Sequence, residues 1–291
     1  MKAHPSYIFS LLLFLCGCSS EIAEEAAKII EKPVPILINI PKQIDVETKA
    51  AVNAFTTDNI SHIKIYRTDN LYSDGISPYS NNLNSQLAFD SPVVYPVDGS
   101  DVTLYSYYPS YIQDTNQPTT ANEIAFSISG QDDLMYASAQ AGNKSHPISV
   151  NLTFDHKLAQ VKFKLKSNIN DSLEPSSAVN IIATGPNTGT MDITNGNVDI
   201  ASGTTGTFIL STGFTFGQLL TNDETVISGE LLLFPKSEYS FSLQIGDSYY
   251  PVTFDQQALT TSWNESSVYT LTISINSLNN PQSTPVVKEN I

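Results

Sequence analysis

The sequence predicts an all-β protein made of two antiparallel β-sandwich domains in tandem. From residue 34 onward, apolar and polar residues alternate with a period of two, the pattern of strands that bury one face. Turn dipeptides such as Asp74-Gly75 and Asn195-Gly196 separate these runs. The chain has 291 residues, more than one small domain usually holds, so two domains are expected.

Residues 1–17 are typical of a lipoprotein signal peptide. Residues 8–15 are apolar except for one Ser, a stretch too short to span a membrane but suited to a signal-peptide core. Leu15-Cys16-Gly17-Cys18 resembles the bacterial lipobox, in which small residues precede the lipidated Cys. We therefore expect cleavage before Cys18 and palmitate-type acylation there, which would anchor the chain to a membrane. The alternative is an ordinary secretory signal with incidental cysteines.

Composition and charge exclude several kinds of site and partner. Cys16 and Cys18 are the only cysteines, so after cleavage no disulfide, Cys metal site or thiol nucleophile can form. The net charge of −15 repels nucleic acid and anionic lipid. Hydrophobic residues make up 41% of the chain, enough to build substantial cores.

Residues 18–33 are interpreted as a tether. Glu24 and Lys28 are spaced for a short helix that Pro33 would end, while a flexible acidic linker is the alternative. Acidic residues directly after the lipidated Cys also resemble the surface-export signal of Bacteroidetes lipoproteins.

The alternating runs place the two sandwiches at residues 34–140 and 146–276. Small and polar residues at 138–146, followed by Pro147, suggest the boundary. Residues 277–291 contain Pro281 and Pro285 and are expected to form a flexible tail. The strands expected with most support are residues 34–40, 62–66, 101–108, 123–129, 148–154, 161–166, 239–245 and 269–275.

Two features of the predicted strand at residues 161–166 bear on its pairing: the short connection before it and the lysines on one of its faces. Six residues, 155–160, join the runs at 148–154 and 161–165, which suits either a hairpin or a short arch. Lys162, Lys164 and Lys166 share one face of the second run. That face is either simply solvated or opposed by an acidic partner.

No catalytic centre, metal site or cofactor is predicted. His62, His146 and His156 lack metal-ligand spacing, and each is interpreted as a packed or capping residue. Acidic residues that could bind Ca²⁺ are more simply explained as turn residues, and residues 192–199 as a hairpin through Asn195-Gly196. These are Asp98, Asp101, Asp132, Asp133, Asp192 and Asp199.

Several motifs, in the right order, resemble the fimbrillin family of Bacteroidetes. The most specific is the Phe-x-His-x-Leu-Ala-x-Val-x-Phe run at residues 154–163. A departure is Glu265-Ser266, where the family often has Gly. The other matching pieces are Tyr95-Pro96, Tyr105-Ser106-Tyr107-Tyr108-Pro109, Asp133-Leu134-Met135-Tyr136-Ala137, Leu231-Leu232-Leu233-Phe234-Pro235 and Trp263 with Tyr269.

The resemblance implies two transthyretin-like sandwiches and a structural or adhesive role in type V pili, as stalk, anchor or tip. It implies a location at the outer membrane, the cell surface and the fimbrium, and donor-strand exchange with other fimbrillin subunits as the means of assembly. His156 would then pin a turn by bonding a backbone group. The alternatives are a surface glycan-binding lipoprotein that forms no filaments, with Tyr105, Tyr107 and Tyr108 as a sugar platform, and an enzyme.

Strand exchange would require an N-terminal strand to leave, and residues 34–40 are the candidate. The family's well-studied protease cuts after Arg, but Arg67, the only Arg, ends a later strand. We therefore expect either cleavage near Lys42 or Lys49 by another protease, or an uncut chain acting as anchor or tip. The tail around residues 284–287 is a candidate donor strand, although Pro285 limits its pairing.

One modification site is predicted. Asp171-Ser172-Leu173 resembles the Bacteroidetes O-glycosylation motif, so Ser172 is a candidate acceptor.

Overall fold

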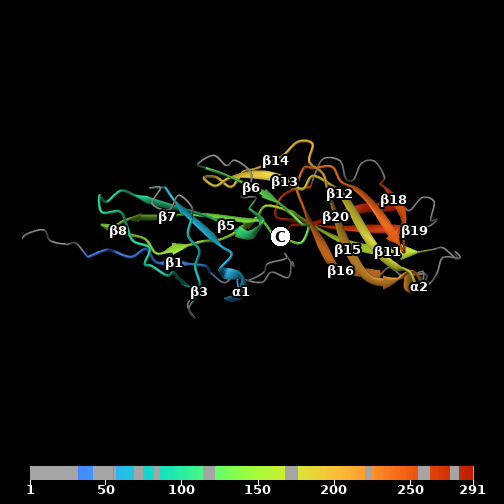
Figure 1. The fold of residues 1–291 in the computed structure, drawn as a ribbon, viewed down its shortest axis with the longest axis horizontal. Helices are drawn as coiled ribbons and strands as arrows, with labels where there is room; N and C mark the ends of the chain where they lie inside the picture. Colours follow the sequence, from blue (N-terminus) through green and yellow to red (C-terminus); the bar gives the residue numbers. More distant parts are fainter. Residues whose placement is uncertain are drawn as a thin grey trace, which may run out of the picture. The chain divides into compact units, whose positions relative to one another are not determined.

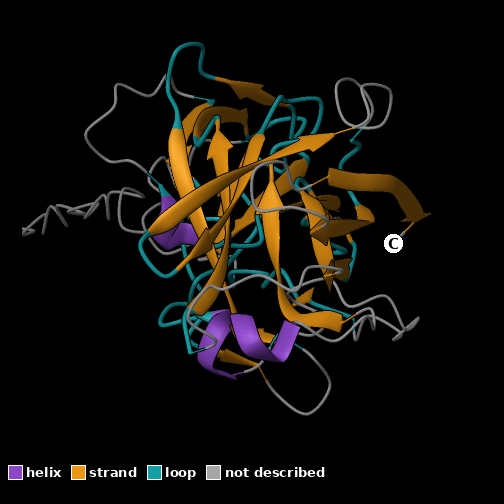
Figure 2. Ribbon diagram, turned by 90° about the vertical axis from the view of Figure 1, so that its right-hand side faces the viewer, coloured by secondary structure: helices purple, strands orange, loops and turns teal. Residues whose placement is uncertain are grey.

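The structure, a computed structural model, describes residues 32–41, 55, 57–68, 75–81, 86–113, 122–167, 176–219, 225–254, 263–275 and 282–290. In these ranges the protein is almost entirely β-structure, which confirms the predicted fold class (Figure 1 and Figure 2). The helical elements are α1 (Thr57–Ile60), a 3₁₀ turn (Ser110–Ile112) and α2 (Phe216–Leu219). The strands are β1 (Ile38–Asn39), β2 (Lys64–Arg67), β3 (Ser80–Asn81), β4 (Leu87–Ala88), β5 (Val102–Tyr108), β6 (Glu123–Ser127), β7 (Met135–Asn143), β8 (His146–Pro147), β9 (Val150–Asn151), β10 (Asp155–His156), β11 (Ala159–Ser167), β12 (Ala178–Gly185), β13 (Thr188–Asp192), β14 (Val198–Ile200), β15 (Gly206–Thr215), β16 (Thr225–Leu233), β17 (Ser240–Ile245), β18 (Ser248–Phe254), β19 (Ser267–Ile275) and β20 (Gln282–Asn290).

The largest sheet has the strand order β15-β12-β17-β18-β20-β19-β11-β16. Its two four-stranded halves meet at a short parallel link, in which only Thr253 and Phe254 of β18 pair with Gln282 and Ser283 of β20. Aromatic side chains from the two halves pack together. The ring centroids of Phe163 in β11 and Phe241 in β17 are 5.9 Å apart. The sequence therefore folds here as two layers around a shared apolar core.

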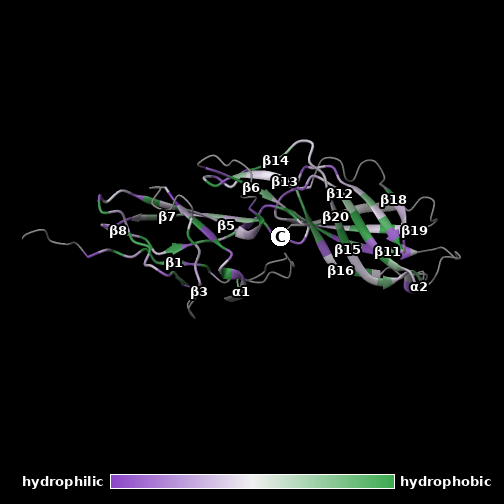
Figure 3. Ribbon diagram, viewed as in Figure 1, coloured by the Kyte–Doolittle hydropathy of each residue, from purple (hydrophilic) through white to green (hydrophobic). Residues whose placement is uncertain are grey.

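Strand β11 shows how the alternation builds this core. Val161, Phe163 and Leu165 are fully buried, while the lysines between them are only partly exposed on the other face. In Figure 3 green, apolar stretches run along β11 and β12. The register sets Glu230 of β16 opposite Lys162, so the lysine face does have an acidic cross-strand neighbour within the chain.

The segment before β11 is an arch and not a hairpin. Strand β9 pairs with β1, β10 pairs with β7, and β11 pairs with β16 and β19, so successive strands enter different sheets. The smaller sheets are β10-β7-β5-β2 with β8 beside β7, β14-β13-β6, β1-β9 and β3-β4. Buried apolar side chains accordingly fall into two clusters, one centred on β5, β7 and the segment of β1 and the other on the large sheet.

The expected domain boundary does not coincide with a linker. Residues 138–143 are the second half of β7, where Ala141 is fully buried, and a tight turn leads to β8. A small residue is required at Gly142, because a Cβ there would overlap the His146 carbonyl oxygen. By its contacts the chain from Val34 to Ile291 forms one compact unit, so the two-domain division at 34–140 and 146–276 stays a prediction.

The expected tail contains a strand. β20 pairs antiparallel with β19, from Ser267 opposite Asn290 to Ser274 opposite Gln282. The register shifts between Thr270 and Thr272, and Pro285 lies in the extra stretch that results. A bulge tolerates Pro because one residue there makes no ladder hydrogen bond, which explains why Pro285 does not exclude a strand.

Candidate functional site

The candidate assembly site is the N-terminal strand, residues 34–40, with the chain segments on its two sides. On one side the Ile36 amide donates to the Val93 carbonyl at 2.7 Å, and the Tyr95 amide donates to the Val34 carbonyl at 2.9 Å. On the other side the Val150 amide donates to Leu37 at 2.8 Å. The strand is therefore held by backbone hydrogen bonds along both edges.

The side chains of this strand alternate as the sequence predicted. Ile36, Ile38 and Ile40 are buried at 5%, 1% and 7% exposure, whereas Leu37 is 46% exposed. The three isoleucines belong to the apolar cluster that also contains Leu104. Removal of the strand would uncover an apolar groove with two unpaired strand edges, a surface that accepts another extended strand.

A side-chain contact adds to the backbone bonds of this strand. The Asn39 amide nitrogen donates to the Ser149 hydroxyl at 3.0 Å and to the Val150 carbonyl at 3.1 Å. These bonds tie the end of the N-terminal strand to the start of β9.

Most of the predicted processing and modification positions lie outside the described residues. These positions are Cys18, Lys42, Lys49 and Ser172. Arg67 is described: it is 3% exposed, and its guanidinium donates to the Val94 carbonyl at 2.8 Å. A protease could reach Arg67 only after local opening of the strand that contains it.

His156 has a different partner from the one predicted. Its Nδ1 lies 2.9 Å from the Asp133 carboxylate, and both residues are buried, at 6% and 2% exposure. The prediction of a backbone bond was therefore wrong for the side chain, because β10 pairs with β7 close to Asp133 and brings the imidazole to the carboxylate. The backbone carbonyl of His156 accepts a 2.7 Å hydrogen bond from the Ser266 hydroxyl.

The three tyrosines of β5 do not form a sugar platform. Tyr107 is 1% exposed and Tyr108 is 6% exposed, because the end of β5 is covered on both faces. Tyr107 stacks on Tyr66, and Phe55 packs edge-on against Tyr108. Burial raises the pKa of Tyr107 and of Tyr108, as expected for phenols inside a core. Tyr105, which is partly buried, packs against the core of the large sheet.

Two of the acidic residues considered as Ca²⁺ ligands, Asp98 and Asp132, bond within their own turns, whereas Asp101 and Asp133 bond residues far away in the chain. Asp98 accepts hydrogen bonds from the Ser100 amide and hydroxyl, and Asp132 from the Ser129 hydroxyl. Asp101 accepts a bond from Asn143. Within the part of the chain that the structure describes, no three His, Cys, Asp or Glu side chains group as metal ligands.

Residues 192–199 form the expected hairpin between β13 and β14. The Asp192 carboxylate accepts hydrogen bonds from the Thr194 hydroxyl at 2.7 Å and the Thr194 amide at 2.8 Å, and these bonds lower the pKa of Asp192. Gly196 takes a φ of +73°, which is the backbone conformation that Asn-Gly turns supply.

The remaining described histidines are not grouped. His62 packs edge-on against the ring of Tyr111 at 5.0 Å, and His146 is exposed in β8. No helix within the described ranges is long and apolar enough to cross a membrane.

Comparison with known proteins identifies the family to which the sequence is similar. A family model described as fimbrillin-like matches residues 48–289. A search of curated proteins finds no match. Among solved structures, a protein from Bacteroides uniformis, provisionally described as a cell adhesion protein, aligns with a TM-score of 0.58 and 15% identity over 90% of this chain and 98% of its own. A protein from Bacteroides ovatus with the same description aligns with a TM-score of 0.55 and 17% identity over 89% and 97% of the two chains. At these identities the two structures show a shared fold.

Proposed function

The chain belongs to the fimbrillin-like family, and on that premise we propose that it is a lipid-anchored subunit of type V pili that assembles by donor-strand exchange. The family consists of fimbrial structural subunits and not of enzymes. The observation that carries the proposal is the N-terminal strand, which is bonded along both edges and buries three isoleucines. Such a strand can be replaced by an equivalent strand from a neighbouring subunit without a change in the groove.

The C-terminal strand supports the other half of this exchange. β20 is held to β18 by only two residue pairs, and its remaining pairing is with β19. In its middle, Thr284 pairs with Thr272 before the bulge that contains Pro285. We assign residues 282–290 as the donor strand, because its link to the other half of the sheet is limited to two residue pairs.

A reversible covalent lock tests the exchange. Asn39→Cys with Ser149→Cys places a thiol on each of two residues whose side chains are in contact, with Asn39 Nδ2 3.0 Å from Ser149 Oγ, and a disulfide between them would hold the N-terminal strand in its groove. We expect the oxidised double variant to form no filaments and the reduced form to recover them. The single Asn39→Cys variant controls for the loss of the native contact. Filaments of the oxidised variant as abundant as wild type would refute the exchange.

Processing is tested separately. We propose cleavage after Lys42 or Lys49, which would release the N-terminal strand from the body of the chain. N-terminal sequencing of the filament protein should then begin within residues 43–50, and Lys42→Gln with Lys49→Gln should block the cut. A filament protein that still begins at Cys18 would contradict strand release and leave the anchor role.

The anchor is the third part of the proposal. Cleavage before Cys18 and acylation of that residue would hold the precursor at the outer membrane before assembly. Cys18→Ser should abolish incorporation of a labelled fatty acid, while Cys16→Ser leaves it intact. Equal labelling of both variants would exclude Cys18 as the lipidated residue.

A further inference from the structure

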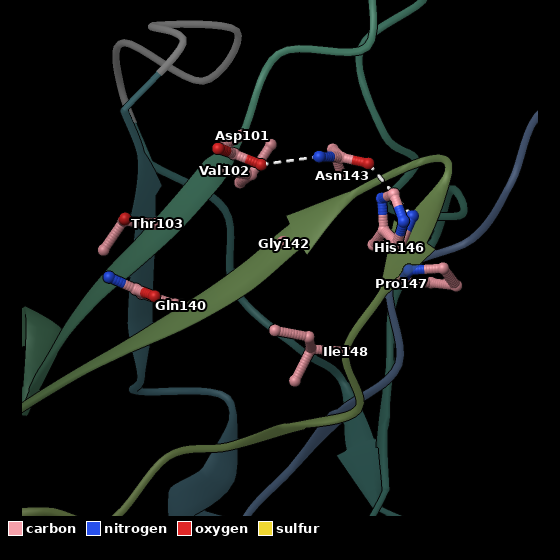
Figure 4. A pocket seen from close by; sticks show the side chains of 9 residues that line it. All are labelled: Asp101, Val102, Thr103, Gln140, Gly142, Asn143, His146, Pro147 and Ile148. Atoms are coloured by element: carbon pink, nitrogen blue, oxygen red, sulfur yellow. Dashed lines mark hydrogen bonds between the residues drawn. The ribbon is translucent and has the colours of Figure 1, made fainter.

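A hollow of about 580 Å³ lies beside the end of the β5–β7 pair and the turn into β8 (Figure 4). This volume lies in the range of small-molecule sites, roughly 300–1,000 Å³. Asp101 and Thr103 line it from the β5 side, and Gln140 and His146 from the β7–β8 side. The sequence analysis did not predict this hollow, because two of the four residues fall in an expected strand and two in an expected linker.

A β-bulge creates the hollow. Val102 pairs with Gly142, but Thr103 pairs with Gln140, so Ala141 is an extra residue on β7. Gly142 has a φ of +71°, and a Cβ at this position would overlap the His146 carbonyl oxygen. Bulges bend a strand and redirect its side chains, and they are frequent beside functional sites.

The surrounding backbone is held in place by polar side chains. The Asn143 amide donates to Asp101 at 2.7 Å, and its oxygen accepts the backbone amides of Ser145 and His146, both at 3.0 Å. The Tyr95 hydroxyl donates to the Ala141 carbonyl at 2.5 Å and accepts the Ile148 amide at 3.2 Å. The hollow is therefore formed before a ligand arrives, which lowers the entropic cost of binding.

The polar groups that face this hollow retain hydrogen-bonding capacity. Among the described residues, the second carboxylate oxygen of Asp101, the Thr103 hydroxyl, the Gln140 amide and the His146 ring have no hydrogen-bond partner. They combine acceptors and donors within one small volume. Ile148, which is 49% exposed, adds an apolar wall.

From these groups we propose that the hollow binds a neutral hexose unit of a glycan. A pyranose has adjacent hydroxyls that both donate and accept hydrogen bonds, and an apolar C–H face that suits Ile148. The Asp101 carboxylate and the net charge of −15 disfavour an acidic sugar. This inference goes beyond the proposed function, because sugar binding requires neither filaments nor strand exchange.

Saturation-transfer NMR on the purified full chain tests the site, with the methyl glycosides of galactose, glucose and mannose as probes and N-acetylneuraminic acid as the acidic comparison. Asp101→Asn retains the acceptor for Asn143 but removes the charge, and should weaken binding by about 10-fold or more. Gln140→Ala, at an exposed position, should weaken it by about 5-fold. Ser138→Ala, an exposed residue of β7 that does not line the hollow, is the matched control and should bind as wild type.

The expected result is saturable binding of at least one neutral glycoside that both hollow variants weaken. Absence of transfer to all three glycosides, binding that neither variant changes, or equal binding of the acidic sugar would each overturn the assignment. The strand-exchange proposal does not depend on this result, because the disulfide lock is scored on filaments alone.

Discussion

The hydroxyl of Ser266 donates a 2.7 Å hydrogen bond to the backbone carbonyl of His156, 110 positions earlier in the chain. The Ser266 amide also donates to the Leu158 carbonyl at 3.2 Å. Ser266 has a φ of +53°, in the left-handed region that favours glycine. The turn for which the fimbrillin family often has Gly is thus retained here, with a serine whose hydroxyl bonds to the arch before β11.

At Ser266 the hydroxyl bond should stabilise the fold and the positive φ should destabilise it. Ser266→Ala retains the left-handed backbone and loses the hydroxyl bond, so the free energy of unfolding should fall by about 1 kcal/mol. Ser266→Gly loses the same bond but removes a backbone cost of about 1 kcal/mol. We therefore expect the Gly variant to be the more stable of the two. Denaturant unfolding followed by fluorescence of Trp263, the only tryptophan, measures this order, and a more stable Ala variant would contradict it.

The buried His156–Asp133 pair should be important for stability. His156→Ala removes the imidazole from a carboxylate that is 2% exposed, and we expect the free energy of unfolding to fall by about 1–3 kcal/mol. His146→Ala, at an exposed position, should change stability by less than about 0.5 kcal/mol. A double-mutant cycle with Asp133→Asn isolates the coupling between the two side chains. A coupling free energy near zero would mean that the hydrogen bond between the two side chains does not contribute to stability.

The N-terminal strand should be held mainly by its buried face. Ile38→Ala removes a side chain that is 1% exposed and should lower the free energy of unfolding by about 2–5 kcal/mol. Leu37→Ala, its neighbour on the exposed face, should cost less than about 1 kcal/mol. Equal losses in the two variants, measured by denaturant unfolding, would show that the two faces are not distinguished in solution.

The hairpin at Asn195-Gly196 should not tolerate a side chain. A Cβ at Gly196 would overlap the ring of Tyr136, in addition to the cost of a φ of +73°. Gly203 has a φ of +82° with open space around it, so Gly203→Ala should cost only the backbone term, about 1 kcal/mol. We expect Gly196→Ala to cost at least about 1 kcal/mol more. Similar thermal unfolding of the two variants would exclude the ring contact.

Asp192 should titrate below its ordinary pKa of 3.8, because the Thr194 hydroxyl and amide bond its carboxylate. A lowered pKa in the folded state means that this group stabilises the fold above pH 3.8, and that the contribution is lost as the pH falls through the folded value. Thr194→Val should raise the pKa of Asp192 in a carboxyl NMR titration. Asp98, whose pKa is lowered by Ser100, should not change in that variant. A constant Asp192 pKa would assign the shift to the Thr194 amide and the Asn195 side chain, which also bond the carboxylate.

Period-two alternation reports which face of a strand is buried, and this was enough to predict β11, β19 and the N-terminal strand. Asn195-Gly196 predicted its hairpin for an equally local reason, since the turn requires a positive φ. The same signal was weaker in β15, which was not predicted individually. Its buried Phe208 and Leu210 flank Ile209, which is 61% exposed. An apolar residue therefore lies on the solvent-exposed face and interrupts the alternation.

The partners of each strand depend on contacts between residues far apart in the chain, which no local pattern encodes. The glycan-binding alternative required an exposed Tyr107, but Tyr107 stacks on Tyr66 in the core. His156 contacts Asp133 because β10 pairs with β7. Pro281 and Pro285 led to the prediction of a tail. Whether Pro285 can lie in a strand depends on the bulge opposite β19, which the local sequence does not show. The sequence alone therefore predicted the all-β class, several strands with their buried faces, and the family resemblance. Long-range pairing established which segments flank the N-terminal strand and β20, and where the bulge at Gly142 lies.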